Sequence, residues 1–363
     1  MKPFIERLDN EIRKSVNNHY TDNVDFIKFP HVINSKRSIR TKISNFFRFH
    51  FYDLLNKVKP LVYYSNSEIA ALTSLDEKLE EEIDKDLLVK IIAYRKLGFH
   101  KVKLPLSNAS YWKKFYLIDS KVDKADFIDP HFSNFILYKH KFDKLDIELY
   151  FTSKGVLTDL ELEQYAYRNK SEVIGVKEGD IVIDAGGCWG DTALYFAAKI
   201  GKKGAVYSFE FIPSNVAIFK KNINLNPHLK ETINLVENPV WEKSGVEMYY
   251  LDNGPASKVS FNEISAGNNK VRTKSIDDLV LEKNIQKIDF IKMDIEGAEP
   301  NALKGAVDTI KRFKPVLAIA IYHSMDDFIN IPKWIDALDL GYKFYLGHYT
   351  IHSEETILFA KVK

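Results

Sequence analysis

The stretch 180–200, "DIVIDAGGCWGDTALYFAAKI", decides which fold this chain adopts. Its first residues are apolar and β-branched, which predicts a buried strand that ends at Asp184. Glycines follow at positions 186, 187 and 190, where the backbone must bend sharply, and a helix is expected to begin near Asp191 and Thr192. This order predicts a ligand-binding turn of an α/β fold, although the turn alone is equally consistent with a purely structural role.

The glycine turn does not follow the pattern of a dinucleotide loop, G-x-G-x-x-G. The register that starts at Gly187 places Trp189 and Thr192 where glycines are needed, and the register one residue earlier fails too. An acid at position 191 would also repel a pyrophosphate at the helix start. The pattern acid-x-Gly-x-x-x-Gly fits better, with the acid meeting the amino group of an amino-acid-like ligand and the loop wrapping a sulfonium nucleoside. The expected contacts are Asp184, Gly186, Gly187, Cys188, Gly190, Asp191 and Thr192.

The rest of the chain from about Val173 alternates short β-branched runs with amphipathic helical patterns, which predicts a doubly wound α/β fold with a mostly parallel sheet. The last two runs, "YKFYLGHYT" and "TILFAKVK", are separated only by "IHSEE", which is too short for a crossover helix. We therefore expect an antiparallel C-terminal hairpin. A Rossmann-like sheet that ends in such a hairpin is the layout of class I S-adenosylmethionine-dependent methyltransferases, and an ordinary dinucleotide dehydrogenase does not end this way.

The length of 363 residues and the hydrophobic content of 45% predict about two domains. Residues 1–150 carry mainly helical patterns, and we expect an accessory region for oligomerisation or acceptor binding. Residues 151–363 are expected to form the S-adenosylmethionine-binding methyltransferase domain. Stretch 142–156 alternates like a hairpin that leads into this domain, and stretch 247–275 has the pattern of strands and a loop inserted as a lid over the site.

The charges are almost balanced, with 52 basic and 50 acidic residues and a net charge of +2, so the composition gives no reason to expect nucleic-acid binding. A single cysteine excludes an internal disulfide. The longest apolar runs are far shorter than the roughly 20 residues that span a bilayer, and the N-terminal residues lack the apolar region of a signal peptide. We therefore expect a cytoplasmic protein without a transmembrane segment.

Further candidate ligand contacts lie at the ends of the next two strands. The run "AVYSFEF" places Glu210, with Phe211 beside it, 26 residues after Asp184. A carboxylate there suits the two ribose hydroxyls of an adenosine ligand, whereas the alternative is a solvated acid at a strand end. The run "LVENPVW" places Asn238 and Val240 where they are expected to contact the adenine edge.

The stretch "IDFIKMDIEGAEPNALKGA" carries the most charges of any predicted strand. Lys292, Asp294 and Glu296 occupy alternate positions, so their side chains project to one side of an extended chain. Burying these charges inside the sheet would be too costly, so we expect them at its carboxyl edge. Glu299, just before a proline, is interpreted as a structural acid at a helix N-terminus. The next strand ends in "YHSMDD", where His323 fits a general base, a metal ligand or an ordinary loop histidine.

Together these stretches resemble the FkbM family of S-adenosylmethionine-dependent O-methyltransferases over about 200 residues, from roughly Glu163 to the end. The "KxDxEGxE" signature, which begins at Lys292, is the most specific of them, and the loop departs modestly, with "GGCWG" where "GANIG" is common. The resemblance implies S-adenosylmethionine as cofactor and methyl transfer to a hydroxyl, often on a sugar of a surface glycan or on a natural product. The matching stretches are "VIDAGGCWGDTALYFA", "VYSFEFIPSNVAIFKKNINLN", "TKSIDDL", "IDFIKMDIEGAEPNALKGA", "PVLAIAIYH" and "HYT…ETILFA".

Methyl transfer to a hydroxyl requires a group that accepts the hydroxyl proton. Asp294 and His323 are the candidates for this base, and Glu296 and Lys292 are expected to orient the acceptor. A divalent metal, magnesium or manganese, held by Asp294, Glu296 and His323 is an open variant of the same site.

Other functions stay open at the level of sequence. One is an NAD-dependent nucleotide-sugar-modifying enzyme, and another is a non-catalytic adenosyl-ligand-binding subunit of a glycan assembly complex. The expected partner is a small-molecule or glycan acceptor. Stretch 35–55, "SKRSIRTKISNFFRFHFYDLL", is basic and aromatic, which fits peripheral contact with an anionic membrane or an amphipathic helix that packs in the core or in a homo-oligomer interface.

Overall fold

A computed structural model describes residues 2–27, 64–132, 135–261 and 269–363. Stretch 35–55, singled out for membrane contact, lies outside the described residues. The chain divides into two compact units, one of Met1–Tyr111 with His348–Thr356 and one of Trp112–Gly347 with Ile357–Lys363. The division expected at residue 150 therefore falls inside the second unit.

The described part of the first unit is helical, as the sequence indicates. Phe4, Leu8 and Ile12 repeat every four residues along one face of its first helix and are fully buried. Arg7 on the same helix pairs with Asp76 at 2.5 Å. Among the described residues, the helices that lie entirely in this unit are α1 (Phe4–Ser15), α4 (Asn66–Lys78) and α5 (Glu82–Leu97).

The second unit is built on a seven-stranded sheet in the order β14-β15-β13-β12-β6-β7-β8. Its central strands pair in parallel, and β15 pairs with β13 in the antiparallel direction. Both the mostly parallel sheet and the terminal antiparallel strand confirm the sequence prediction. The strands are β6 (Ile181–Ala185), β7 (Ala205–Phe209), β8 (Ile233–Val236), β12 (Phe290–Met293), β13 (Val316–Ala320), β14 (Tyr342–His348) and β15 (Thr356–Val362).

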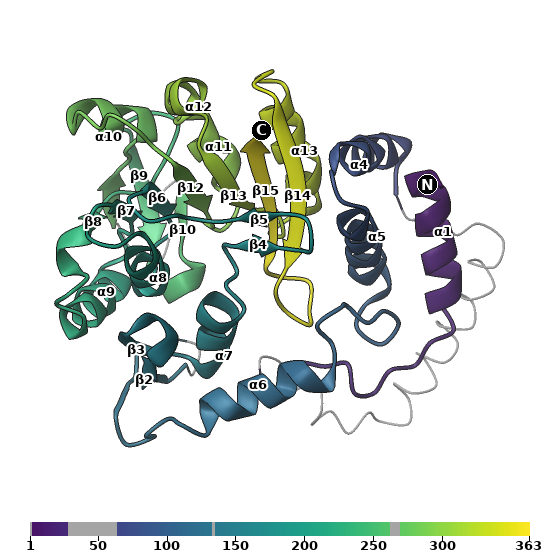
Figure 1. Cartoon of the computed structure of the whole chain (residues 1–363), viewed down its shortest axis with the longest axis horizontal. Coiled ribbons are helices and arrows are strands. Elements are labelled where there is room, and N and C mark those ends of the chain that lie inside the picture. Colours follow the sequence, from purple (N-terminus) through teal and green to yellow (C-terminus); the bar gives the residue numbers. More distant parts are fainter. Residues whose placement is uncertain (1, 28–63, 133–134, 262–268) are drawn as a thin grey trace. The chain divides into compact units, whose positions relative to one another are not determined.

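Helices cover both faces of this sheet, which is why its central strands are buried and mostly apolar. Every residue of β12 is buried, and β13 and β6 are buried except at their first residues. Figure 1 shows α8 and α9 on one side of the sheet and α10, α11 and α12 on the other. The helices are α8 (Asp191–Ile200), α9 (Pro213–Leu225), α10 (Ile276–Glu282), α11 (Glu299–Lys304), α12 (Val307–Phe313) and α13 (Met325–Asp336).

Smaller sheets surround the main one. A hairpin of β2 and β3 is present, but it begins before the expected stretch 142–156, which contains the last residue of its first strand, the whole of its second strand and the start of a helical segment. Strands are present in the described part of 247–275. The three sheets have the strand orders β1-β2-β3, β4-β5 and β10-β9-β11. Their strands are β1 (Phe127–Ile128), β2 (Leu137–Phe142), β3 (Ile147–Phe151), β4 (Tyr167–Arg168), β5 (Val173–Ile174), β9 (Glu247–Leu251), β10 (Lys258–Ser260) and β11 (Lys270–Arg272). The connecting helices are α6 (Ala109–Asp119), α7 (Ser153–Gly155) and η3 (Val156–Glu161), and 3-10 turns are η2 (Asp143–Leu145), η4 (Lys230–Thr232) and η5 (Gly254–Ala256).

The strand register brings the charged residues to one edge of the sheet. Asp184 on β6 lies opposite Lys292 on β12 and opposite Ser208 on β7. Met293, the last residue of β12, lies opposite Ile319 near the end of β13. The segments that follow β6, β7, β12 and β13 therefore meet at the carboxyl edge, where open α/β sheets bind their ligands.

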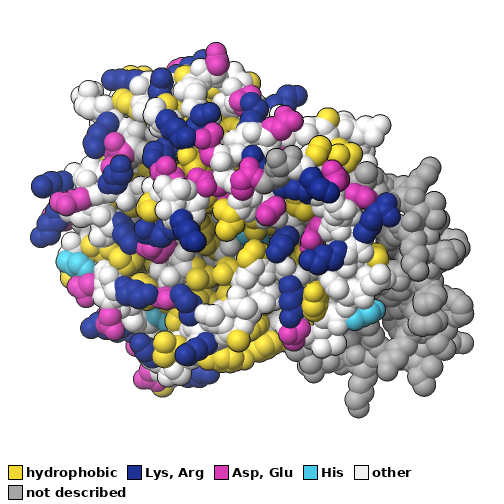
Figure 2. All heavy atoms as spheres, turned by 45° about the vertical axis from the view of Figure 1, so that its right-hand side comes forward, with side chains coloured by type: hydrophobic (Ala, Val, Ile, Leu, Met, Phe, Trp, Pro, Cys, Tyr) yellow, Lys and Arg dark blue, Asp and Glu magenta, His cyan; other side chains and the backbone are white. Residues whose placement is uncertain are grey.

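The surface gives no sign of a membrane span or of a one-signed patch on the face in view. Among the described residues, no helix combines the length and the apolar character that crossing a bilayer requires. Figure 2 shows Lys and Arg side chains interspersed with Asp and Glu side chains over the visible face.

Candidate functional site

The turn between β6 and α8 holds the predicted glycines in places that a side chain would disturb. Gly186 and Gly190 have positive φ angles of 90° and 83°. A Cβ added to Gly186 would lie 2.0 Å from the carbonyl oxygen of Asp294, and one added to Gly187 would lie 2.1 Å from Oγ of Ser208. The glycines therefore let the turn pack directly against the ends of β12 and β7.

The amide groups of this turn are bonded inside the protein. The N–H groups of Gly186 and Gly187 donate to the carbonyl oxygen of Phe209, at 3.2 and 2.8 Å. Cys188, with a φ of 42°, donates its N–H to the carboxylate of Glu210, and burial raises the pKa of its thiol. A phosphate binds through free backbone N–H groups, and these N–H groups of the turn are already bonded. The turn is therefore poorly suited to bind a phosphate.

Asp184 is fully buried, and three neighbours occupy its carboxylate. Oγ1 of Thr192 donates to both oxygens at 3.0 Å, and Oγ of Ser208 donates to Oδ2 at 2.7 Å. Nζ of Lys292 lies 3.1 Å from Oδ1. A direct contact between Asp184 and a ligand amino group, as the sequence predicts, would require one of these partners to move. In this arrangement Asp184 fixes the turn.

Lys292 supports the glycine turn from the neighbouring strand. Its side chain is 2% exposed, and Nζ donates to the carbonyl oxygens of Ala185 at 3.2 Å and Gly186 at 2.6 Å. Burial would lower the pKa of Lys292, but the charge of Asp184 raises it above its ordinary value. The expected role of Lys292 in orienting an acceptor would require it to leave these oxygens, because its three donors already face the turn.

Asp191, the first residue of α8, has a carboxylate oxygen without a hydrogen-bond partner among the described residues, whereas both oxygens of Asp184 are occupied. The side chain is buried, and Oδ1 makes no hydrogen bond within the described part of the chain. Burial raises the pKa of Asp191 to about 6, against the opposing charge of Lys292. An acid at a helix N-terminus disfavours a phosphate and suits a cationic ligand group.

Glu210 follows β7 and is 7% exposed. Its Oε1 accepts N–H groups from Phe211 and Ile212, both at 2.7 Å, and its Oε2 faces Nδ2 of Asn215 at 3.4 Å. Burial raises the pKa of Glu210 to about 7, against these opposing hydrogen bonds. The carboxylate is therefore held in one orientation, while Oε2 has the weaker contact and the greater capacity to accept a hydroxyl.

Asn238 and Val240 follow β8 and contact the segment after β11. Nδ2 of Asn238 donates to the carbonyl oxygen of Arg272 at 2.8 Å, and Val240 forms a parallel bridge with Lys274. Contact of these two residues with an adenine stays a prediction.

Asp294 follows β12 and accepts hydrogen bonds from two tyrosines. The hydroxyl of Tyr165 donates to Oδ2 at 2.8 Å, and the hydroxyl of Tyr322 donates to Oδ1 at 3.0 Å. Nε2 of His323 lies 3.3 Å from Oδ1. Burial would raise the pKa of Asp294, but the contact with His323 lowers it below its usual range. Asp294 is thus a charged carboxylate with an ordered set of neighbours.

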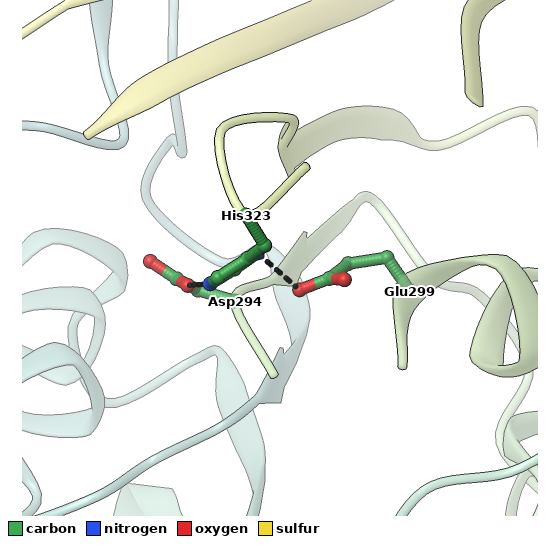
Figure 3. Close-up of side chains that lie close together, drawn as sticks. All are labelled: Asp294, Glu299 and His323. Carbon is green, nitrogen blue, oxygen red and sulfur yellow. Dashed lines mark ion pairs between the residues drawn. The ribbon is translucent and has the colours of Figure 1, made fainter. Parts of the chain in front are cut away.

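His323 lies between two carboxylates, one on each side of its ring (Figure 3). Nδ1 is 3.4 Å from Oε1 of Glu299, which also accepts the N–H of Ile295 at 2.8 Å. Burial would lower the pKa of His323, yet Asp294 together with Glu299 raises it to about 9. Burial raises the pKa of Glu299 to about 7, against the opposing charge of His323. Asp294, Glu299 and His323 thus form a compact acid–imidazole cluster.

Glu296 lies at the rim of the acid–imidazole cluster. Its φ is 57°, its side chain is 35% exposed, and Oε2 is 4.0 Å from Nε2 of His323. The three donors that come within 4.8 Å of one another are Asp294, Glu299 and His323. The expected metal-ligand set of Asp294, Glu296 and His323 stays a prediction, and the compact group contains Glu299 but not Glu296.

Several residues of the site were not predicted from sequence. Ser208 is a polar residue inside a buried strand, a signal that could have identified it, and Tyr322 precedes the predicted His323. Tyr165 and Asn215 carry no signal of this kind, because they reach the site from segments without a charged pattern. Glu299 does start a helix, as expected, but it also faces His323.

The comparison with known protein families agrees with this geometry. Residues 173–344 match the family model described as the methyltransferase FkbM domain. This chain carries an FkbM methyltransferase domain. The match includes the glycine turn, Glu210 and the acid–imidazole cluster, so the resemblance seen in the sequence is confirmed for these parts. A sequence search of the curated proteins gives no match.

Several solved structures are similar to this chain, and one of them, with a TM-score above 0.5, shows the fold. The methyltransferase FkbM from Methylobacillus flagellatus KT matches with a TM-score of 0.51 and 17% identity, over 81% of this chain and 58% of that chain. This chain thus spans less than two thirds of that relative. An S-adenosylmethionine-dependent methyltransferase from Aquifex aeolicus matches with a TM-score of 0.34 and 18% identity, over 65% of this chain and 100% of that chain. An O-methyltransferase from Bacillus cereus in complex with SAH matches with a TM-score of 0.35 and 13% identity, over 70% and 92%.

The fold is therefore that of the class I methyltransferases. Strand order, terminal hairpin and family match all agree on this point. Family and fold together support an S-adenosylmethionine-dependent methyltransferase as a general class.

Proposed function

We propose that this chain is an S-adenosylmethionine-dependent O-methyltransferase that acts on a hydroxyl group of a sugar, in a surface glycan, a nucleotide-sugar or a natural product. The proposal rests on the grouping of two sets of residues at one edge of the sheet in the FkbM domain. The glycine turn after β6 and the acid–imidazole cluster after β12 and β13 meet at this edge.

The residues on the β6 and β7 side fit the cofactor. Gly186 and Gly187 let the turn pack closely against the ends of β12 and β7, and Oδ1 of Asp191 is a buried carboxylate oxygen without a hydrogen bond among the described residues. We assign Asp191 to the cationic amino group and Oε2 of Glu210 to the ribose hydroxyls. When bound, S-adenosylmethionine supplies an electrophilic methyl group on a sulfonium.

The same residues argue against an NAD-dependent enzyme. A pyrophosphate binds through free backbone N–H groups at a helix N-terminus. Here the N–H groups of Gly186 and Gly187 already donate to Phe209, and α8 begins with an acid, Asp191. The pyrophosphate of a dinucleotide would find these N–H groups already bonded, and the negative charge of Asp191 would repel it.

The β12 and β13 side fits the chemistry of a hydroxyl acceptor. A hydroxyl becomes a competent nucleophile when its proton is accepted as the new bond forms, and a positioned base contributes roughly a hundred- to ten-thousand-fold. We assign this role to Asp294, with His323 beside it as the neighbouring positive charge that stabilises the carboxylate. Glu296 at the rim is the residue best placed to orient the acceptor, whereas Lys292 holds the turn.

The acceptor class follows from the family resemblance. A sugar hydroxyl is a weak acid and needs the base that this site provides. The proposal includes a small-molecule or glycan partner, action in the cytoplasm and a contribution of the N-terminal region to acceptor binding or oligomerisation.

The test is a transfer assay with labelled S-adenosylmethionine and nucleotide-sugar or glycan pools from the source cells, with mass detection of the product. We expect a product that gains one methyl group on a sugar oxygen. Methylation of nitrogen or carbon would contradict the hydroxyl assignment. Binding of S-adenosylmethionine without transfer to any pool would favour a non-catalytic subunit.

A further inference from the structure

We propose that Asp294, Glu299 and His323 form a binding site for one divalent cation of the magnesium or manganese type. The three residues come from separate segments, after β12, at the start of α11 and after β13. One donor atom from each lies within 4.8 Å of the other two, and Figure 3 shows the three side chains turned toward one another.

Unbonded polar atoms inside the cluster are the second observation. The side chain of His323 is 10% exposed, and neither ring nitrogen makes a hydrogen bond within the described residues. Glu299 is fully buried, and its Oε2 likewise makes none in the part of the chain that the structure describes. The ring nitrogens of His323 do have ion-pair contacts, with Asp294 at 3.3 Å and Glu299 at 3.4 Å, so Oε2 of Glu299 is the buried atom of the cluster that lacks a partner among the described residues. Buried polar groups are nearly always bonded, so this oxygen points to a ligand that completes it.

The balance of charge at the cluster points to a cation. Three carboxylates face one imidazole, with Asp294 at 3.3 Å, Glu299 at 3.4 Å and Glu296 at 4.0 Å from its nearest ring nitrogen. The buried lysine nearby, Lys292, already lies against Asp184 and the glycine turn. Buried charges are stable when paired or when they coordinate a metal, and a divalent cation would balance the excess of negative charge.

Neighbouring groups already hold the proposed ligands in place. The hydroxyl of Tyr165 donates to Oδ2 of Asp294 and that of Tyr322 donates to Oδ1, the oxygen that also faces His323. The N–H of Ile295 donates to Oε1 of Glu299, which leaves Oε2 for a ligand. Such outer-shell hydrogen bonds orient carboxylate ligands in metal sites. Two carboxylates and one imidazole suit manganese and magnesium, and manganese accepts the nitrogen more readily.

The cation would act on the acceptor if the proposed function holds. A hydroxyl oxygen bound to a divalent cation loses its proton more easily. With the cation present, Asp294 would serve as a ligand, and the proton would pass to the half-buried Glu296 in place of Asp294. The site itself is argued without methyl transfer, and it can be tested in the absence of cofactor and acceptor.

The test is a titration of the full-length, metal-stripped protein with Mn²⁺ alone. Binding is monitored by electron paramagnetic resonance, as the loss of the signal of free Mn²⁺. We expect one saturable Mn²⁺ per chain. Glu299→Gln should weaken binding ~10-fold or more, because even outer-shell partners contribute that much. Glu296→Gln is the matched control, also a carboxylate near His323, and should bind nearly as well as wild type.

A second readout does not depend on variants. Pulsed measurements on the Mn²⁺-loaded wild type should detect a nitrogen coupled to the ion, from His323. Absence of saturable binding, absence of the nitrogen coupling, or a loss in Glu296→Gln that equals the loss in Glu299→Gln would each overturn the proposal. A methyltransferase that is active with no bound ion would overturn the role of the cation in methyl transfer and leave the proposed function standing.

Discussion

The two sides of the site differ in how their buried charges are balanced. On the side of β6 and β7, Asp184 has Lys292 and two hydroxyl donors, and Glu210 accepts two backbone N–H groups. On the side of β12 and β13, carboxylates outnumber the single imidazole, and atoms of Glu299 and His323 remain without hydrogen bonds in the described chain.

The difference separates a supporting side from a reacting side. A charge whose partners are all supplied by the protein is expensive to remove but inert, because breaking a buried pair leaves the other charge unpaired. A charge without a full set of partners is available for a ligand. Two groups are exceptions on the first side: Oδ1 of Asp191 is unbonded in the described structure, and Oε2 of Glu210 has only a long contact with Asn215, at 3.4 Å. The comparison predicts that variants on the two sides fail in different ways.

The largest expected effect is the loss of catalysis on the reacting side. Asp294→Asn should lower kcat by roughly a hundred- to ten-thousand-fold, because it removes the base or its metal ligation, while the affinity for S-adenosylmethionine stays close to wild type. Labelled methyl transfer and calorimetry measure the two quantities. Asp326→Asn, at an exposed acid in the first turn of α13, is the control and should remain active. Normal turnover by Asp294→Asn would remove Asp294 from the chemistry.

The next effect is a loss of stability on the supporting side. Lys292→Met leaves Asp184 as a buried charge without its cation and should lower the free energy of unfolding by about 3–5 kcal/mol. Lys287→Met breaks an exposed pair with Asp289, in which the lysine side chain is 52% exposed, and should cost about 0–1 kcal/mol. Urea denaturation followed by tryptophan fluorescence compares them. Equal losses would show that Lys292 does not support the turn.

The pH dependence of cofactor binding sharpens the role of Glu210. Its pKa is raised to about 7, so the carboxyl is mostly neutral at pH 6 and mostly charged at pH 8. A carboxylate accepts ribose hydroxyls better than a carboxylic acid, so the affinity for S-adenosylmethionine should rise ~10-fold from pH 6 to pH 8. Calorimetry at both values measures it. In Glu210→Gln the rise should shrink to about twofold, the part that Asp191 contributes because its pKa is about 6. An unchanged rise in that variant would assign it to another group.

The smallest effect concerns the helix that follows His323. Oγ of Ser324 accepts the N–H of Asp327 at the start of α13, so Ser324→Ala should cost about 1 kcal/mol of stability. Ser65→Ala removes the equivalent cap of α4 in the other unit and should cost a similar amount. Thermal melts measure both. If Ser324→Ala alone also weakens Mn²⁺ binding, the cap contributes to the position of His323 as well as to the helix.

Much of the fold could be predicted from the sequence because its signals are local. Apolar runs between amphipathic helices identify the parallel strands, and the short "IHSEE" segment allows only a hairpin between the last two strands. The glycine turn was also predictable, since positions 186 and 190 require positive φ angles. These properties depend on a few adjacent residues.

The partners within the site depend on contacts between distant segments. Asp184 and Lys292 pair only because β6 and β12 are neighbours in register, and Tyr165 reaches Asp294 from a segment without a pattern of its own. Glu299 could be predicted as a helix-start acid, but its second neighbour, His323, comes from another strand end. The spacing in the sequence predicts which side chains lie at the sheet edge. The packing of distant segments determines which of these side chains already have a hydrogen-bond or ion-pair partner.

The most direct test of the central claim is calorimetry of the whole protein with S-adenosylmethionine and, separately, with NAD. The account predicts that S-adenosylmethionine binds with one site per chain, that Asp191→Asn and Glu210→Gln both weaken this binding, and that NAD does not bind. Binding of NAD without binding of S-adenosylmethionine would contradict it.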